Sequence, residues 1–310
     1  MSEEYITLDG LCQQLSISRA TGRNWLRLGK IESQGIDPAG QMYFTEEYVS
    51  NLKQSLETGE RRSLRSRRNK RYVSGKGLYD RYVSDICEST DTVKSLVDKL
   101  ERQNICVTEM VMRTLLADCA LKLLVSSGEI TVDREIFPAY IDGSLTIGVW
   151  SALIDDIIQD KKAALSWANN NKNLMDTNYY YQKGEDVLGL LYMSIRDAGS
   201  RKAAGSYYTP TKVVRTLISD VTGDMGSRIS EGGKRLFDPC CGTGNFLIQL
   251  PDDIELNNIY ACDIDELSVQ LARFNLALGR LSGRRHVNVD EAIWTIYEHI
   301  ERRDFISEYR

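Results

Sequence analysis

The sequence of 310 residues predicts an α/β fold in which a parallel sheet occupies the C-terminal third. After residue 235, short apolar runs that end near an aspartate alternate with helical patterns, which is typical of parallel strands joined by helices. A largely helical region and a compact N-terminal pattern of helices and turns precede the sheet. We therefore expect domains at residues 1–78, 79–200 and 201–310.

The composition is that of a globular protein, with 42% hydrophobic and 27% charged residues. The acidic start lacks the apolar core of a signal peptide. The most apolar stretch, residues 110–125, is interrupted by charges before it reaches the roughly 18 apolar residues of a membrane span. We expect a cytoplasmic protein without a membrane partner. Scattered cysteines without Cys-x-x-Cys spacing argue against a disulfide framework and a zinc site.

The first 50 residues predict two short helices joined by a tight turn. The first helix carries an apolar stripe, formed by Leu8, Leu11, Cys12 and Leu15. Residues 16–18 supply the turn and an N-cap for the second helix. Residues 36–44 are then expected to form a small hairpin, and residues 46–56 a third helix. This order of elements defines a compact N-terminal module.

Two helices joined in this way are the helix-turn-helix plan, whose second helix enters the major groove of DNA. With the hairpin as a wing, the pattern resembles the winged helix-turn-helix of the mercury-resistance-regulator and excisionase type. The resemblance implies a set of DNA-contacting residues on the second helix: Arg19, Thr21, Arg23, Asn24 and Arg27. A small helical packing module that never meets nucleic acid is the alternative.

A strongly basic stretch follows, which the net charge of −5 hides. It contains seven positive residues within eleven positions and no acid: Arg61, Arg62, Arg65, Arg67, Arg68, Lys70 and Arg71. Phosphate contacts add up and depend on salt, so such an arm would strengthen DNA binding. A solvated linker is the alternative interpretation.

The middle of the chain is expected to be mostly helical. Between residues 111 and 124, pairs of apolar residues recur every four positions, which predicts a core helix with one broad apolar face. Residues 167–183 are rich in asparagine and tyrosine and are expected to form a polar connection to the next helix. Tyr179, Tyr180 and Tyr181 would either stack on bases or pack at a domain boundary. Packing is the favoured interpretation.

The segments that carry chemistry begin at residues 186–192 and continue through residues 201–210. Thr209 and Pro210 predict a helix start that would suit a carboxylate. The buried face of this helix is expected to consist of Val213, Val214, Leu217 and Ile218. A short strand then ends in Asp238, and a turn containing Gly242 and Gly244 leads into a further helix at residue 245. This is the first strand, loop and helix of a doubly wound fold, without the third glycine of a dinucleotide site.

Two more strands are expected to follow. The second, residues 259–262, ends at Asp263, and a helical pattern runs from residue 267 to 276. The third, residues 299–303, precedes Asp304. Acids at parallel strand ends share one sheet edge, and an acid at the tip of the second strand is suited to binding ribose hydroxyls.

These segments, taken in order, resemble the S-adenosylmethionine-binding motifs of adenine-specific DNA methyltransferases. The matching segments are Tyr-Tyr-Thr-Pro at 207–210, Asp-Pro-Cys-Cys-Gly-Thr-Gly-Asn-Phe-Leu at 238–247, Asp-Ile-Asp at 263–265 and Asp-Phe-Ile at 304–306. The family meant is the gamma class of type I and type IIG restriction-modification systems. The resemblance implies a partial Rossmann-like sheet that binds S-adenosylmethionine, and N6-adenine methylation of double-stranded DNA in restriction-modification or phage defence. A bare Rossmann-type nucleotide site is the alternative.

The resemblance also assigns residues to the parts of S-adenosylmethionine. Tyr208, Thr209 and Pro210 are assigned to the methionine end; Asp238, Gly242 and Gly244 to its amino acid moiety; Asp263 to the ribose; Ile264 to the adenine face; and Asp304 with Phe305 to the adenine amino group and ring.

The family transfers the methyl group at a motif with two adjacent prolines, which polarises the target amine and stacks the flipped base. The sequence has five prolines, none of them adjacent, and six residues after Asp304. We therefore expect no catalytic residue here, an exposed first strand, and a second polypeptide that supplies catalysis and target recognition. The alternatives are an inactive truncated remnant and a non-catalytic DNA-binding regulator or assembly subunit.

Overall fold

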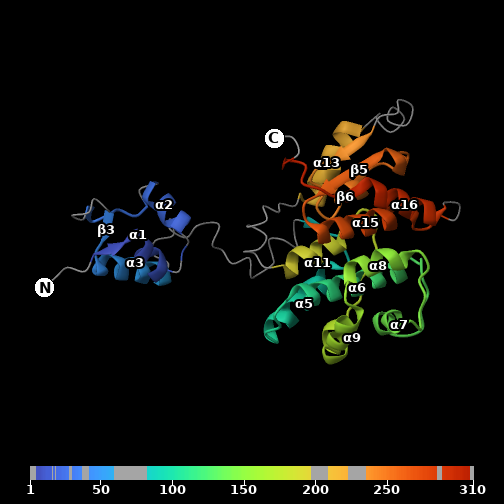
Figure 1. Ribbon diagram of the computed structural model, residues 1–310, viewed down its shortest axis with the longest axis horizontal. Coiled ribbons are helices and arrows are strands. Elements are labelled where there is room, and N and C mark those ends of the chain that lie inside the picture. The colour runs from blue at the N-terminus through green and yellow to red at the C-terminus, as the bar shows by residue number, and fades with distance from the viewer. Residues whose placement is uncertain are drawn as a thin grey trace. The chain divides into compact units, whose positions relative to one another are not determined.

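The chain divides into two compact units, residues 1–73 and 74–310. The structure is a computed structural model. It describes residues 5–15, 17, 19–27, 30–36, 42–58, 82–196, 209–222, 235–284 and 288–307. Figure 1 shows the helices and strands of each unit and labels many of them.

The first unit has the predicted helices and hairpin, and it adds a short first strand that the sequence does not predict. Its elements are β1 (Ile6–Thr7), α1 (Leu8–Gln14), α2 (Arg19–Arg27), β2 (Gly35–Ile36), β3 (Met42–Phe44) and α3 (Glu46–Thr58). The strands form an antiparallel sheet in the order β1-β3-β2, so the expected hairpin is confirmed as β2 paired with β3. Thr7 starts α1 because its hydroxyl accepts a hydrogen bond from the Gly10 N–H.

This unit has a hydrophobic core of its own. Its buried members are Leu11, Cys12, Trp25, Ile31, Phe44, Val49 and Leu52. Leu8 and Leu15 pack at the edge of this core, as the predicted stripe requires. α1 and α2 meet at Gly22, where an added Cβ would lie 2.4 Å from the Cys12 Sγ. The absence of a side chain at Gly22 therefore permits the close approach of the two helices.

The second unit is built from helices and a small sheet. Its helices are α5 (Thr90–Arg102), α6 (Glu109–Ser126), α7 (Ile136–Ile141), α8 (Trp150–Ile158), α9 (Lys161–Asn170), α10 (Lys172–Met175), α11 (Val187–Ile195), α13 (Thr211–Thr222), α15 (Glu266–Leu281) and α16 (Val289–His299). The short 3₁₀ helices η1 (Leu247–Gln249) and η2 (Leu256–Asn258) lie between the first two strands of its sheet.

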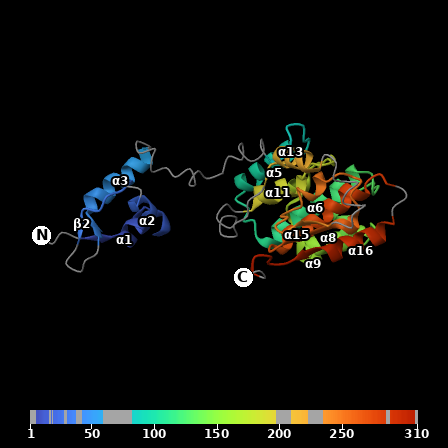
Figure 2. The ribbon, with the colours of Figure 1, turned by 90° about the horizontal axis from the view of Figure 1, so that it is seen from above.

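The sheet of the second unit is parallel. Its strands β4 (Leu236–Asp238), β5 (Ile259–Asp263) and β6 (Ile300–Arg302) lie in the order β4-β5-β6. All three fall where the sequence predicts them. α15 and α16 connect β5 to β6, and α15 packs beside α8 and α16 (Figure 2). In the described part of the chain β4 pairs on one side only, with β5.

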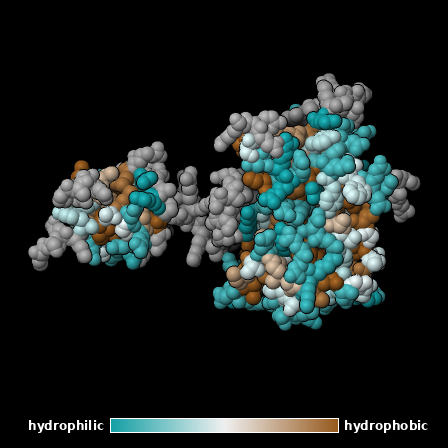
Figure 3. Space-filling view, viewed as in Figure 1, coloured by the Kyte–Doolittle hydropathy of each residue, from teal (hydrophilic) through white to brown (hydrophobic). Residues whose placement is uncertain are grey.

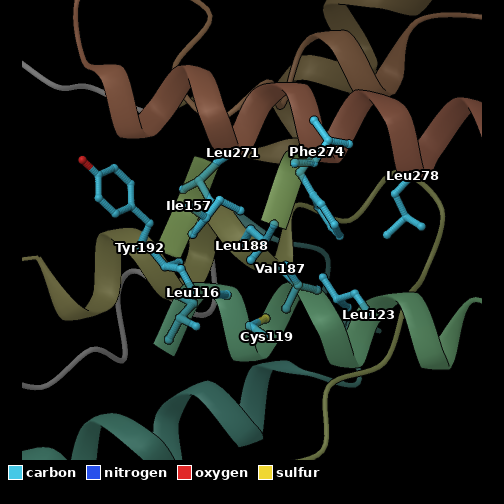
Figure 4. Close-up of a cluster of buried hydrophobic side chains, with 14 of the residues drawn as sticks. Leu116, Cys119, Leu123, Ile157, Val187, Leu188, Tyr192, Leu271, Phe274 and Leu278 are labelled. Carbon is cyan, nitrogen blue, oxygen red and sulfur yellow. The ribbon is translucent and has the colours of Figure 1, made fainter. Parts of the chain in front are cut away.

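One hydrophobic core runs through the second unit. Figure 4 shows side chains of α6, α8, α11 and α15 pointing toward one another, among them Leu116, Ile157, Leu188, Leu271 and Phe274. Helices on both sides of residue 200 contribute to this core. The helical region therefore packs directly on the helix that follows β5.

α6 differs from its prediction of one broad apolar face. Burial extends around the helix and includes Arg113 and Asp118, each less than 5% exposed. Arg113 donates to Gln270 at 2.9 Å and to the Ile157 carbonyl at 3.2 Å, and Asp118 pairs with Lys122 at 2.6 Å. Buried charges require such partners, so polar contacts allow a charged helix to occupy the core.

Three further expectations need correction. The tract 167–183 is partly helical, because α9 ends and α10 lies within it. The helix expected from residue 245 is only the 3₁₀ turn η1. In α13, Val214 is buried, but Val213 and Leu217 are each 46% exposed, so the expected buried face is only partly covered. Figure 3 shows hydrophobic residues scattered among hydrophilic ones on one face of the second unit.

The tyrosine triplet is divided between the core and the surface. Tyr179 is 3% exposed and belongs to the main core, whereas Tyr180 is 44% exposed. The favoured packing role is therefore confirmed for Tyr179. Within the described ranges, no helix combines the length and the apolar character that crossing a membrane requires.

Candidate cofactor site

The carboxyl ends of the three parallel strands bring the predicted acids to one edge of the sheet. Asp238 ends β4, Asp263 ends β5, and Asp304 follows β6. The Gly242 N–H donates to the Asp263 Oδ2 at 2.8 Å, which joins the loop after β4 to the end of β5. The Arg303 N–H donates to the Asp263 carbonyl at 3.0 Å, which joins the end of β6 to the same residue. Asp263 is therefore at the centre of this edge.

The loop after β4 depends on glycine. Gly242 has φ 54° and Gly244 has φ 88°, in the left-handed region that residues with a side chain rarely adopt. A Cβ on Gly244 would lie 3.1 Å from the Cα of Ala272 in α15. The loop can therefore lie against α15 only with glycine at this position, and its backbone N–H groups remain close to the strand ends.

The Asp263 carboxylate is oriented by the backbone. Its Oδ1 accepts from the Asp265 N–H at 2.9 Å, and its Oδ2 accepts from Gly242. Each carboxylate oxygen has a second acceptor position, so the group can still accept hydrogen bonds from hydroxyl groups of a ligand. The next residue, Ile264, is 57% exposed and offers an apolar surface beside this carboxylate.

The acids at this edge influence one another. Burial raises the pKa of Asp238, the nearby Asp263 raises it further, and a hydrogen bond from the Cys240 N–H partly opposes both. Burial and then the charges of Asp263, Asp238 and Asp304 raise the pKa of the exposed Cys240 thiol. The edge is therefore electronegative and suited to ligand groups that donate hydrogen bonds or carry positive charge.

The end of β5 is also held by a second carboxylate. Asp265 caps α15 and accepts hydrogen bonds from the Tyr192 hydroxyl at 2.6 Å and from Arg196 at 2.5 Å. Burial raises the pKa of Asp265, but the Tyr192 hydrogen bond and the Arg196 charge outweigh burial and keep it below its usual value. α11 is thereby joined to the strand end that carries Asp263.

The segment before α13 lies against the same loop. Asn245 donates its side-chain N–H to the Thr209 carbonyl at 2.9 Å and accepts from the Thr211 hydroxyl at 3.2 Å. The Pro210 carbonyl accepts from the N–H groups of the next turn, so α13 begins directly after it. Thr209 and Pro210 thus reach the site, while Tyr208 lies outside the described residues.

Two aromatic rings lie at the other end of the edge. Phe305 packs on Phe237 of β4 with ring centroids 5.3 Å apart, and Phe237 is still 42% exposed. Asp304 is exposed next to this pair. Apart from Tyr208, the residues that the sequence assigns to a cofactor therefore gather along the glycine loop and the strand ends.

Comparison with known proteins identifies the segment that carries this site. Residues 183–300 match the sequence model of the family described as N-6 DNA Methylase. The site therefore lies in a segment that is similar to N6-adenine DNA methyltransferases. The methyltransferase segment, residues 183–300, contains β4, β5, the glycine loop and Asp263.

The chain is also similar to a type II methyltransferase. Type II methyltransferase M.VspI from Vibrio sp. (strain 343) is 27% identical over 178 residues. The match covers 57% of this chain and 38% of M.VspI, so the chain spans well under half the length of that relative. No solved structure matches the chain.

Some residues that support the methyltransferase segment were not recognised from the sequence. The sequence assigns no role to Asp186 or Asn275, although both lie in one buried hydrogen-bond cluster with Thr243. Tyr82 joins this cluster from a position 104 residues before Asp186. A signal for Asp186 existed, because an acid three positions before a glycine N–H can cap a helix.

The structure describes only some of the residues that are expected to contact DNA. Arg19 and Arg23 are exposed on α2, and Thr21 is partly buried. Arg19 forms an exposed ion pair with Asp9 at 2.6 Å. The side chains of Asn24 and Arg27 and the whole arm with Arg61, Arg62, Arg65, Arg67 and Arg68 lie outside the described residues. In the part of the chain that the structure describes, no His, Cys, Asp and Glu cluster could hold a metal ion.

Proposed function

We propose that this chain is the part of a site-specific DNA adenine-N6 methyltransferase that binds S-adenosylmethionine and DNA. The observation that supports the proposal best is the hydrogen bond from Gly242 to Asp263, which joins the glycine loop to the acid at the end of β5. Together with the match of residues 183–300 to the family, it favours a nucleoside-binding edge over a purely structural turn.

The residues fit the cofactor in chemical type. Asp263 accepts hydrogen bonds from the ribose hydroxyls, and the exposed Ile264 covers one face of the adenine. Asp304 and Phe305 meet the adenine amino group and ring. S-adenosylmethionine supplies the methyl group when it is bound.

The opposite end of the cofactor lies along the glycine loop. Asp238 accepts from the ammonium group of the methionine moiety, which bears the positive charge that two neighbouring carboxylates favour. Gly242 and Gly244 let the backbone approach this moiety, and Thr209 and Pro210, with Tyr208, close that end. Binding of the cation lowers the pKa of Asp238, because the charge opposes the effect of burial.

Double-stranded DNA binds to the first unit. Arg23 and Arg19 of α2 face phosphates or base edges, and the basic residues of 61–71 add phosphate contacts. Arg19 leaves Asp9 when it binds DNA, and an exposed ion pair of this kind contributes only about 0–1 kcal/mol. The first unit thereby holds the substrate of a methyl transfer.

Methyl transfer needs residues beyond those described for the cofactor site. We propose that a second polypeptide supplies them and also recognises the DNA sequence. In the described part of the chain, β4 has one unpaired side, and its residue Phe237 is 42% exposed. A further strand on β4 would bury such a surface and complete the sheet.

The proposal is tested with radiolabelled methyl groups. We expect the chain, coexpressed with the polypeptide encoded next to it, to transfer label from S-adenosylmethionine to the N6 of adenine in double-stranded DNA. The chain alone should transfer none. Transfer by the isolated chain would exclude the need for a second polypeptide. Sequence-specific DNA protection by a chain that binds no S-adenosylmethionine would favour a non-catalytic DNA-binding regulator.

A further inference from the structure

We propose that a buried hydrogen-bond cluster around Asp186 positions the glycine loop of the cofactor site, with Tyr82 and Asn275 as positioning residues. The consequence for cofactor binding rests on the proposed function, whereas the effect on the loop itself does not. None of these three residues belongs to the strand ends or the loop.

Asp186 is completely buried and accepts hydrogen bonds from several directions. Its Oδ2 accepts from the Tyr82 hydroxyl at 2.5 Å and from the Thr243 hydroxyl at 2.5 Å. Its Oδ1 accepts from the Asn275 side chain and from the Gly189 N–H, each at 2.7 Å. The donors come from the segment before α5, from α11, from the loop and from α15.

Thr243 is the residue through which this cluster reaches the loop. It lies between the two glycines with positive φ, its hydroxyl binds Asp186, and its carbonyl accepts from Asn275 at 2.9 Å. Both its side chain and its backbone are therefore fixed. Because Gly242 donates to Asp263 next to it, a fixed Thr243 also fixes the N–H that orients the Asp263 carboxylate.

The surrounding space leaves little room for another arrangement. A Cβ on Gly189 would lie 2.1 Å from the Asp186 Oδ2 and 2.4 Å from the Thr243 Oγ1. Burial raises the pKa of Asp186, and the hydrogen bonds from Thr243 and Tyr82 oppose this effect. Loss of one donor therefore leaves the buried Asp186 carboxylate with an unfilled hydrogen-bond position. We expect the glycine loop, which contacts this carboxylate through Thr243, to become less rigid as a result.

If the cluster only stabilised the fold, removal of a similar hydrogen bond elsewhere in the unit would affect the glycine loop equally. The chain offers a control with the same donor and acceptor, because the buried residue Tyr140 also donates its hydroxyl to a carboxylate, that of the partly exposed Asp155. Tyr140 lies in α7 and Asp155 in α8, and neither belongs to the cofactor site. Tyr82→Phe and Tyr140→Phe thus remove the same chemical group from the same unit at two different places.

The experiment measures hydrogen exchange in the peptide 239–249 and binding of S-adenosylmethionine in the full chain. We expect Tyr82→Phe to speed exchange of this peptide and to weaken cofactor binding about tenfold, the loss that corresponds to one hydrogen bond of a buried carboxylate. Asn275→Ala should act in the same direction. Tyr140→Phe should leave both measurements within about twofold of wild type.

Two results would overturn the proposal. One is unchanged exchange of residues 239–249 in Tyr82→Phe and Asn275→Ala. The other is an equal increase in Tyr140→Phe, which would show general loosening of the unit. If the wild-type chain binds no S-adenosylmethionine, the proposed function fails, but the exchange measurement still decides whether the cluster positions the loop.

Discussion

Single residues of the loop determine whether it can adopt its conformation. Gly244 combines a positive φ with contact to α15, whereas Gly283 has φ 74° and no atom within 4 Å of an added Cβ. Gly283→Ala therefore isolates the conformational cost, about 1–2 kcal/mol. We predict that Gly244→Ala lowers the free energy of unfolding in urea by at least about 1 kcal/mol more, because the Ala272 backbone must also move. Equal losses in the two variants would contradict the close approach.

Asp118 gives a prediction about pH. Burial raises its pKa to about 6 in the folded chain, while Lys122 and Thr177 partly oppose this effect. The folded state then binds a proton more tightly than the unfolded state, whose aspartate has its ordinary pKa of about 4. Stability from this group is present at low pH and is lost as the pH rises from about 4 to 6.

The comparison that isolates this effect uses Asp118→Asn. Between about pH 4 and pH 7, the unfolding free energy of wild type should fall relative to that of the variant by up to about 3 kcal/mol. Chemical denaturation at several pH values measures this difference. A difference that stays constant, or grows in favour of wild type as the pH rises, would contradict the assigned pKa shift.

At the scale of elements, α15 joins the core to the site. It begins at the Asp265 cap beside Asp263 and is buried along most of its length. Gly279 lies within this helix, and an added Cβ there would meet its nearest neighbour, Ile248, at 3.9 Å. Gly279→Ala should therefore raise the unfolding free energy by about 0.5–1 kcal/mol through helix propensity. Thermal melting checks this, and destabilisation would indicate that α15 packs more tightly than its contacts suggest.

Some elements could be predicted from patterns in the sequence, and others could not. β4 and β5 were predictable because each is a short apolar run that ends at an aspartate, whereas β6 is mostly charged and was expected from the Asp304 that follows it. The burial of α13 was not predictable, since spacing reveals an apolar stripe but not what covers Val213 and Leu217. The asparagines of the tract 167–183 suggested a loop, but Asn170 ends α9 and Asn171 lies between α9 and α10.

The sequence predicts the acids at the strand ends of the candidate site, but it does not predict the buried residues that hold the glycine loop. Asp238, Asp263 and Asp304 lie at the predicted edge because parallel strands share a direction. The cluster of Tyr82 and Asp186 joins residues 104 positions apart, and only the folded helices bring them together. Local periodicity contains no information about such a pairing.

At the scale of the whole molecule, the division into two units predicts separable functions. Each unit has its own hydrophobic core. Removal of residues 1–73 should leave the S-adenosylmethionine affinity of the remaining chain within about twofold of wild type. DNA affinity should fall, and the slope of log K against log salt should become shallower, because Arg19, Arg23 and the basic arm are lost. Fluorescence anisotropy at several salt concentrations measures this slope, and an unchanged slope would contradict DNA binding by the first unit.

Asp263 is the residue that we propose to anchor S-adenosylmethionine at the end of β5. Isothermal titration calorimetry with wild type, Asp263→Asn and Asp290→Asn tests this role most directly. Asp263→Asn turns one acceptor oxygen into a donor that faces the Gly242 or Asp265 N–H, whereas Asp290 is exposed in the first turn of α16. We predict one binding site in wild type, a loss of about 10- to 100-fold in Asp263→Asn, and no change in Asp290→Asn. Wild-type affinity in Asp263→Asn, or no binding by the wild-type chain, would contradict the account.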